Sequence, residues 1–66
     1  MNQKEKTLIK MWIVNQGLRC DMDVTDARVW YDSEPSPWHC MRFMLALERK
    51  KAFDRFALHL CELLHI

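Results

Sequence analysis

The chain contains few of the residues that form turns. Among its 66 residues there are one glycine and two prolines, whereas an all-β sandwich or barrel needs many turn residues between short strands. This scarcity argues against those folds and favours helices. The formal net charge is only +1, which argues against a strongly basic nucleic-acid-binding protein and against an acidic mimic of nucleic acid.

Long apolar runs and paired cysteines are also missing. The longest uncharged apolar runs, Met11–Val14 and Phe43–Leu47, are far shorter than the roughly 20 residues that a membrane-spanning helix needs. The first residues include lysines but no apolar core or small-residue cleavage site, so no signal peptide is predicted. Cys20, Cys40 and Cys61 form an odd, widely spaced set, which is typical of free thiols in a reducing compartment. We therefore expect a cytoplasmic protein.

Apolar residues are abundant for so short a chain. Half of the residues are hydrophobic, including three Trp, three Phe and five Met. A domain of this size buries only about 60% of the surface that its unfolded chain exposes. Much of the apolar surface therefore cannot fit inside one copy. We expect a single helical domain over residues 1–66 whose core is completed in a homodimer.

The segment pattern predicts an all-α fold, a small helical bundle or hairpin with one long C-terminal helix. Strong helix formers occupy residues 3–16, and Gly17 follows at the place of a left-handed C-terminal cap. Residues 24–32 fit a short helix or, because Ala27, Val29 and Tyr31 alternate with their neighbours, a short strand. We prefer the helix, since a lone strand would have no partner strand within this chain.

The long helix is predicted over residues 37–64. Ser36 is a suitable N-cap and Pro37 a suitable first helical residue. The polar turn Glu48–Lys51 leaves open a bend, although the spacing of its charges favours continuity. The apolar stripe of this helix comprises Trp38, Met41, Leu45, Ala52, Phe56, Leu60, Leu63 and Leu64, and it is widened by Met44, Phe53 and Ala57. For the core and dimer contact as a whole we expect Leu8, Trp12, Leu45, Phe56, Leu60 and Leu63.

Charge is unevenly distributed along the chain. Residues 18–34 are acidic and residues 42–55 are basic. Opposite charges of this kind are expected to attract each other within one chain or across a dimer. Exposed ion pairs contribute only about 0–1 kcal/mol each, so they would set the register of the helices more than their stability.

Catalytic and metal-binding motifs are not evident. His39 and Cys40 are adjacent, and neighbours on a helix point about 100° apart, so they do not form a nucleophile–base pair. Cys61 and His65 share a helix face, but no second close pair of ligands supports a zinc site. We therefore expect no enzyme activity, no cofactor and no metal.

Binding to another protein is the favoured function. Trp30, Tyr31 and Trp38 flank the proline-containing loop, where they would form an exposed aromatic lip for a partner, although each tryptophan equally fits ordinary packing. We predict a small non-catalytic regulatory or accessory protein, similar in size and composition to those of phages and plasmids. The alternative is a dimeric nucleic-acid-binding regulator. Its basic residues would be Arg42, Arg49, Lys50, Lys51 and Arg55.

The first eleven residues, about a sixth of the chain, resemble the beginning of the Rop family of plasmid copy-number regulators. The resemblance is carried by Met1, Glu5, Lys6, Thr7 and Met11. Members of that family are small antiparallel four-helix dimers that bind a pair of RNAs. The family's RNA-contacting Asn, Phe and Gln correspond to Lys10, Val14 and Leu18 here, so RNA binding is not implied. The proline loop and the long third segment also depart from the family pattern, and we assign no family.

Overall fold

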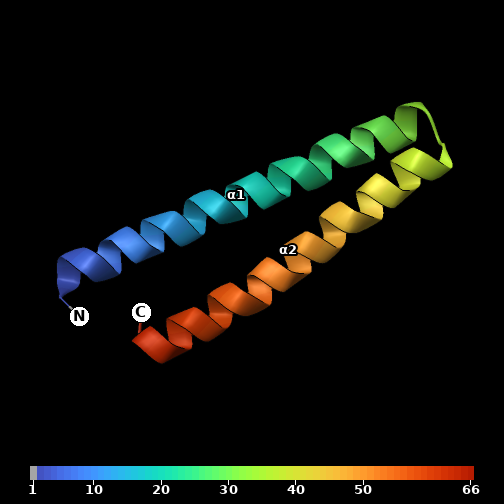
Figure 1. Ribbon diagram of the computed structural model, residues 1–66. Coiled ribbons are helices and arrows are strands. Elements are labelled where there is room, and N and C mark those ends of the chain that lie inside the picture. The colour runs from blue at the N-terminus through green and yellow to red at the C-terminus, as the bar shows by residue number, and fades with distance from the viewer. Residues whose placement is uncertain (1) are drawn as a thin grey trace.

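The protein is an antiparallel hairpin of two long helices (Figure 1). The computed structural model describes residues 2–66, so Met1 of the Rop-like segment lies outside the described residues. Helix α1 spans Gln3–Ser33 and helix α2 spans Pro37–Leu64. The two chain ends lie together at the end opposite the connecting loop (Figure 1). Over the described residues the fold is all-α without strands, as the sequence predicts.

Helix α1 is continuous, so the predicted end at Gly17 is wrong. Gly17 does not adopt a positive φ, and it lies in the helix–helix contact, where an added Cβ would be 3.6 Å from the ring of Phe53. Its missing side chain makes room for that ring instead of capping a helix. Residues 24–32 are helical, which confirms the helix over the strand. They belong to α1 and do not form a separate element.

Side chains and one left-handed residue cap the helix ends. The Asn2 side chain accepts a hydrogen bond from the Glu5 amide at 2.8 Å, and the Ser36 hydroxyl accepts one from the His39 amide at 3.1 Å. These bonds satisfy amides that have no partner within their helix. His65 adopts the left-handed conformation with φ of 55° and ends α2. The predicted cap and bounds of the long helix are therefore confirmed.

The contact between α1 and α2, which we call the seam, is narrow and has small residues at its buried positions. Only Ala27 and Ala46 are buried among the described residues, with exposures of 0% and 3%. Two aromatic contacts extend the seam toward its ends, Tyr31 on Phe43 at 6.1 Å between ring centroids and Trp12 beside Phe53 at 6.3 Å. The half-buried positions of α2 recur every three or four residues, as expected for helices packed side by side. They include His39, Phe43, Lys50, Phe53, Ala57, Leu60 and Leu64.

The hairpin is a rod. Its principal extents are 48 × 16 × 11 Å and its radius of gyration is 15.1 Å. A compact chain of this length would have a radius of gyration of about 11 Å. The rod is only two helices wide, so most side chains that point away from the seam are in solvent.

Candidate interaction surfaces

Two ion pairs cross the seam and fix the register of the helices. Lys50 lies 2.6 Å from the carboxylate of Asp21, and Arg49 lies 4.0 Å from that of Asp23. Asp21 and Asp23 are two residues apart, so they project from opposite sides of α1 and the two pairs flank the seam. The expected attraction between the acidic and basic segments is therefore present within one chain. The hydrogen bond and negative charge of Asp21 raise the pKa of the Lys50 ammonium.

Most residues expected in the core and dimer contact lie outside the seam. Leu60 is half-buried, whereas the other five are exposed. Trp12, Leu45 and Phe56 are each about half exposed, at 48%, 50% and 51%. The prediction for α2 is therefore right in part. Leu60 and Leu64 of the stripe are half-buried in the seam, as are Phe53 and Ala57 beside it. The remaining large residues of the stripe are exposed, namely Trp38, Met41, Leu45, Phe56 and Leu63.

The predicted aromatic lip is divided by the fold. Trp30 and Trp38 are exposed on either side of the loop, and the Trp30 ring lies 5.9 Å from the His39 ring. Tyr31 is half-buried because its ring stacks on Phe43 in the seam. The loop end therefore exposes two tryptophans, whereas Tyr31 contributes to the packing between the helices.

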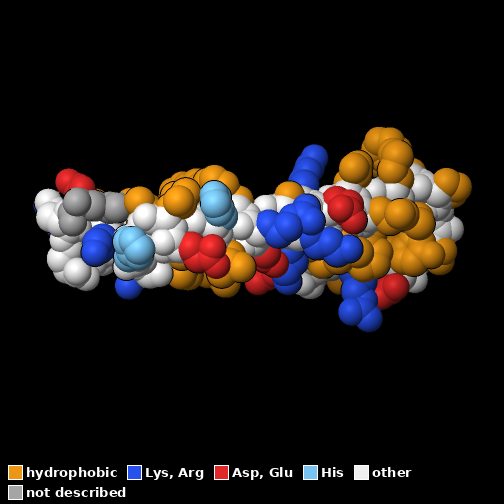
Figure 2. All heavy atoms as spheres, turned by 90° about the horizontal axis from the view of Figure 1, so that it is seen from below, with side chains coloured by type: hydrophobic (Ala, Val, Ile, Leu, Met, Phe, Trp, Pro, Cys, Tyr) orange, Lys and Arg blue, Asp and Glu red, His pale blue; other side chains and the backbone are white. Residues whose placement is uncertain are grey.

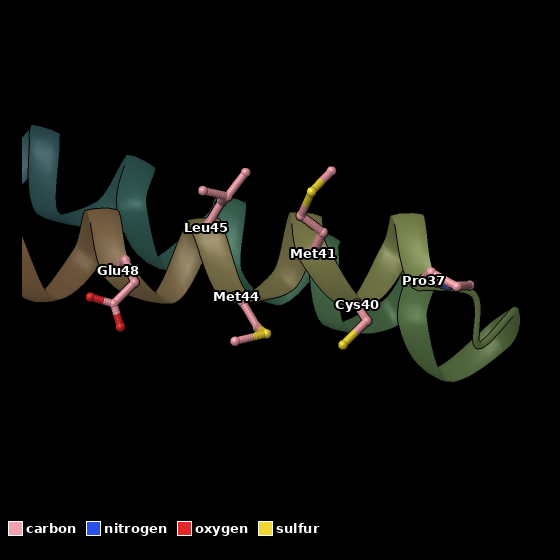
Figure 3. Close-up of a pocket in the computed structure, with 6 residues that line it drawn as sticks. All are labelled: Pro37, Cys40, Met41, Met44, Leu45 and Glu48. Carbon is pink, nitrogen blue, oxygen red and sulfur yellow. The ribbon is translucent and has the colours of Figure 1, made fainter.

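A shallow groove lies on the outer surface of α2 near the loop (Figure 3). Met41 and Leu45 project on one side of it and Cys40 and Met44 on the other (Figure 3). The lining residues follow the i, i+3, i+4, i+7 spacing of the hole that receives one side chain of a neighbouring helix in a coiled coil. They are Pro37, Cys40, Met41, Met44, Leu45 and Glu48. The groove is thus shaped for an apolar side chain projecting from another helix.

Helix α1 has a second apolar row, which the sequence prediction did not separate from the first. Met11, Leu18, Met22 and Val29 are all exposed. Their spacings of seven, four and seven residues place them on one side of the helix, opposite the seam row of Ile13, Cys20, Ala27 and Tyr31. This repeat could have been recognised in the sequence. It was obscured because other apolar residues of the first segment occupy most of the helix circumference.

Basic residues cross the middle of the α2 surface, next to the apolar loop end (Figure 2). Three of the five cations proposed for nucleic-acid binding already face carboxylates, Lys50 and Arg49 across the seam and Lys51 at 3.5 Å from Glu48. Arg42 and Arg55 have no ion pair among the described residues. The positive charge available to a phosphate backbone is therefore smaller than the sequence indicates.

Clusters for other chemistry are not found in the described part of the chain. Residues 2–66 contain no group of three or more His, Cys, Asp or Glu side chains that could hold a metal ion. Cys20, Cys40 and Cys61 are all free and half-buried. Neither described helix is long and apolar enough to cross a membrane.

Comparison with known proteins finds no similarity. No protein-family model, curated protein or solved structure matches the chain. The surfaces of the hairpin are therefore the basis on which its function is inferred.

Proposed function

We propose that this chain is a small non-catalytic regulatory protein that acts by binding another protein, as accessory proteins of phages and plasmids do. The observation that carries the proposal is the exposure of its apolar side chains. Fifteen large apolar side chains among the described residues are 47–67% exposed. Single exposed apolar residues are ordinary, but rows of them mark interaction sites.

The binding site for the target protein is the groove of α2 together with Trp38. Methionine is flexible and polarisable, so Met41 and Met44 can adapt to a partner surface. Trp38, which is 67% exposed, adds a large apolar area next to the groove, and tryptophan is common among residues that dominate binding energy. The free thiols fit a reducing compartment, and we place this interaction in the cytoplasm.

An affinity pull-down from host-cell lysate, with and without nuclease, tests this function. The Met44→Glu variant places a charge in the groove and should abolish capture of the target, because a carboxylate against an apolar partner surface is unpaired. Leu58→Glu is the matched control, since Leu58 is 63% exposed and Met44 61%, and Leu58 lies outside the groove. Capture that disappears with nuclease would instead support the nucleic-acid alternative.

A further inference from the structure

The hairpin exposes more surface than a folded chain of its mass usually does. Its accessible surface is 5340 Å², whereas a compact monomer of 8.0 kDa has about 4,450 Å². A compact dimer of twice that mass would have about 7,400 Å², so pairing two hairpins would bury about 3,300 Å² in total. Permanent homodimers bury about 2,000–5,000 Å². The area that pairing two hairpins would bury is therefore in the range of a homodimer interface.

One side of the hairpin carries large apolar residues from both helices. Asp23 and Arg49 form an ion pair, so the residues in line with Asp23 on α1 and with Arg49 on α2 border the same side of the seam. Steps of four, seven and eleven residues return to nearly the same side of a helix. We call this side the tryptophan face. Its large apolar residues are Leu8, Trp12 and Trp30 of α1 and Trp38, Leu45, Phe56 and Leu63 of α2.

The pattern on the α1 half of the tryptophan face is symmetric about Asp21. Trp12 and Trp30 each lie nine residues from Asp21, and Arg19 and Asp23 each lie two residues from it. If a second α1 ran antiparallel across this face, Trp12 of one copy would meet Trp30 of the other. Arg19 of one copy would then meet Asp23 of the other, which pairs opposite charges.

The α2 half repeats this symmetry at the same level of the rod. Leu45 and Phe56 lie equally far from the midpoint between Lys50 and Lys51, and so do Trp38 and Leu63. The ion pair between Asp21 and Lys50 places the two centres of symmetry side by side. A single two-fold axis can therefore satisfy both helices, which is the requirement for a self-complementary interface.

We infer that a second copy of this chain packs on the tryptophan face, antiparallel to the first, about a two-fold axis at the level of Asp21 and Lys50. The product is a four-helix bundle with its loops at opposite ends. This inference rests on the proposed function, because it assigns one part of the exposed apolar surface to self-contact. Trp38 and Leu45 then belong to the dimer contact, and the target site is reduced to the other side of the α2 groove, where Cys40 and Met44 stay open.

The other ways to pair two copies fit less well. With the two loops at the same end, α1 of one copy would cover α2 of the other at equal levels, and the charges of Arg19 and Asp26 would oppose the apolar Ala52 and Leu45. Pairing through the outer row of α1 would involve one helix only and no tryptophan, so less area would be buried. The arrangement with the loops at the same end would also bring Asp23 to Arg49 of the other copy, and the antiparallel pair sets Arg49 opposite Ala52, so charge does not separate the two. The antiparallel pair is favoured because it opposes large apolar residues to each other, Trp12 to Trp30 and Leu45 to Phe56, on both helices.

Sedimentation equilibrium across a dilution series tests the interface. The wild-type chain should have twice its monomer mass at micromolar concentration. Phe56→Glu should raise the dimer dissociation constant by at least about a hundredfold, because it buries a charge without a partner. Met22→Glu is the matched control on the outer row, similarly exposed at 65% against 51% for Phe56, and should change that constant less than about threefold. Circular dichroism checks that each variant remains helical.

A charge exchange tests the orientation. Arg19→Glu should weaken the dimer about tenfold, because two carboxylates then face each other across the axis. The double variant Arg19→Glu with Asp23→Arg should restore dimerisation to within about threefold of the wild type, because it recreates opposite pairs. The single variant Asp23→Arg measures the separate loss of its ion pair with Arg49. A double variant that dimerises no more tightly than either single variant would overturn the antiparallel arrangement.

The outcomes separate this inference from the function on which it rests. A wild-type chain that stays monomeric at micromolar concentration, or equal effects of the Phe56 and Met22 variants, would overturn the dimer on the tryptophan face. Loss of target capture in the Met44→Glu variant would still support the proposed function in that case. A dimer that captures no protein target would support the inference and count against the function.

Discussion

The seam and the tryptophan face use opposite kinds of residues. The seam holds Ala27, Ala46 and Gly17 at its closest approaches, whereas the tryptophan face holds three Trp and a Phe that remain about half exposed or more. In most small proteins the large apolar residues are the buried ones. Here the two buried residues of the described chain are alanines, the rings of Tyr31, Phe43 and Phe53 are half-buried, and the tryptophans are exposed.

This difference indicates that the two surfaces have separate roles. Small residues let the two helices approach closely, but they bury little apolar area, and burial stabilises by about 25 cal/mol per Å². The large residues could supply far more burial, yet within one hairpin nothing covers them. The hairpin by itself therefore leaves most of its large apolar side chains exposed, and in the proposed interactions their burial would drive association.

Among variants that test this difference between the two surfaces, enlarging a seam residue is expected to change the free energy of unfolding most. Ala27→Leu inserts a bulky side chain where no space is left, since Ala27 is 0% exposed, and should lower the free energy of unfolding by about 1–3 kcal/mol. Urea denaturation at fixed protein concentration measures this. The control is Val29→Leu on the outer row of α1, which should change stability by less than about 0.5 kcal/mol. Equal stabilities of the two variants would contradict a tightly packed seam.

A smaller effect of opposite sign is expected at Gly17. Gly17→Ala should stabilise the protein by about 0.5–1 kcal/mol, because alanine favours the helix more than glycine does. The added Cβ would lie 3.6 Å from Phe53, which is ordinary van der Waals contact. Gly17→Leu should instead destabilise, since its side chain would compete with the Phe53 ring for space. Thermal unfolding of both variants tests the sign, and a destabilised alanine variant would show that the seam is closer there.

The smallest effect is expected from titrating Lys50. Asp21 raises the pKa of Lys50, so the stability that this pair contributes is fully present below the ordinary pKa of lysine and is lost as the pH rises through the raised value. The pair is exposed, so the loss is small. Urea midpoints at increasing alkaline pH should fall more for the wild type than for Lys50→Met. Parallel decreases for both proteins would show that the ion pair does not stabilise the seam.

The bounds of the long second helix were predictable because their signals are local, whereas its continuity through Glu48–Lys51 was favoured but left open. Ser36 and Pro37 define its start whatever the rest of the chain does, and no residue before His65 opposes a helix. The attraction between the acidic and basic segments was predictable for a similar reason, since the order of charges along an antiparallel hairpin brings Asp21 to Lys50. Local chemistry and simple topology suffice for these features.

The choice of buried face was not predictable from the sequence. Both helices are apolar on more than one side, so Trp38, Leu45 and Phe56 satisfy the same periodicity as Phe43, Ala46 and Phe53. Both rows contain large aromatic residues, so the contacts that each row makes with α1 decide which one is buried, and periodicity alone does not encode them. Gly17 was misinterpreted because a glycine after a helical run fits a cap as well as a close contact. For the buried row of α2 and for the role of Gly17, contacts between the two helices decide the structure, and the local sequence does not specify those contacts.

The three-residue connection Glu34–Ser36 has a kinetic consequence. Such a short link leaves little loop entropy to overcome, and helical topologies dominated by nearby contacts fold in microseconds to milliseconds. Each chain can therefore form its hairpin long before it collides with another at cellular dilution. If the proposed dimer forms, newly made copies would first exist as separate hairpins with exposed tryptophans, and the rate of dimerisation would rise with the amount of protein that the cell produces.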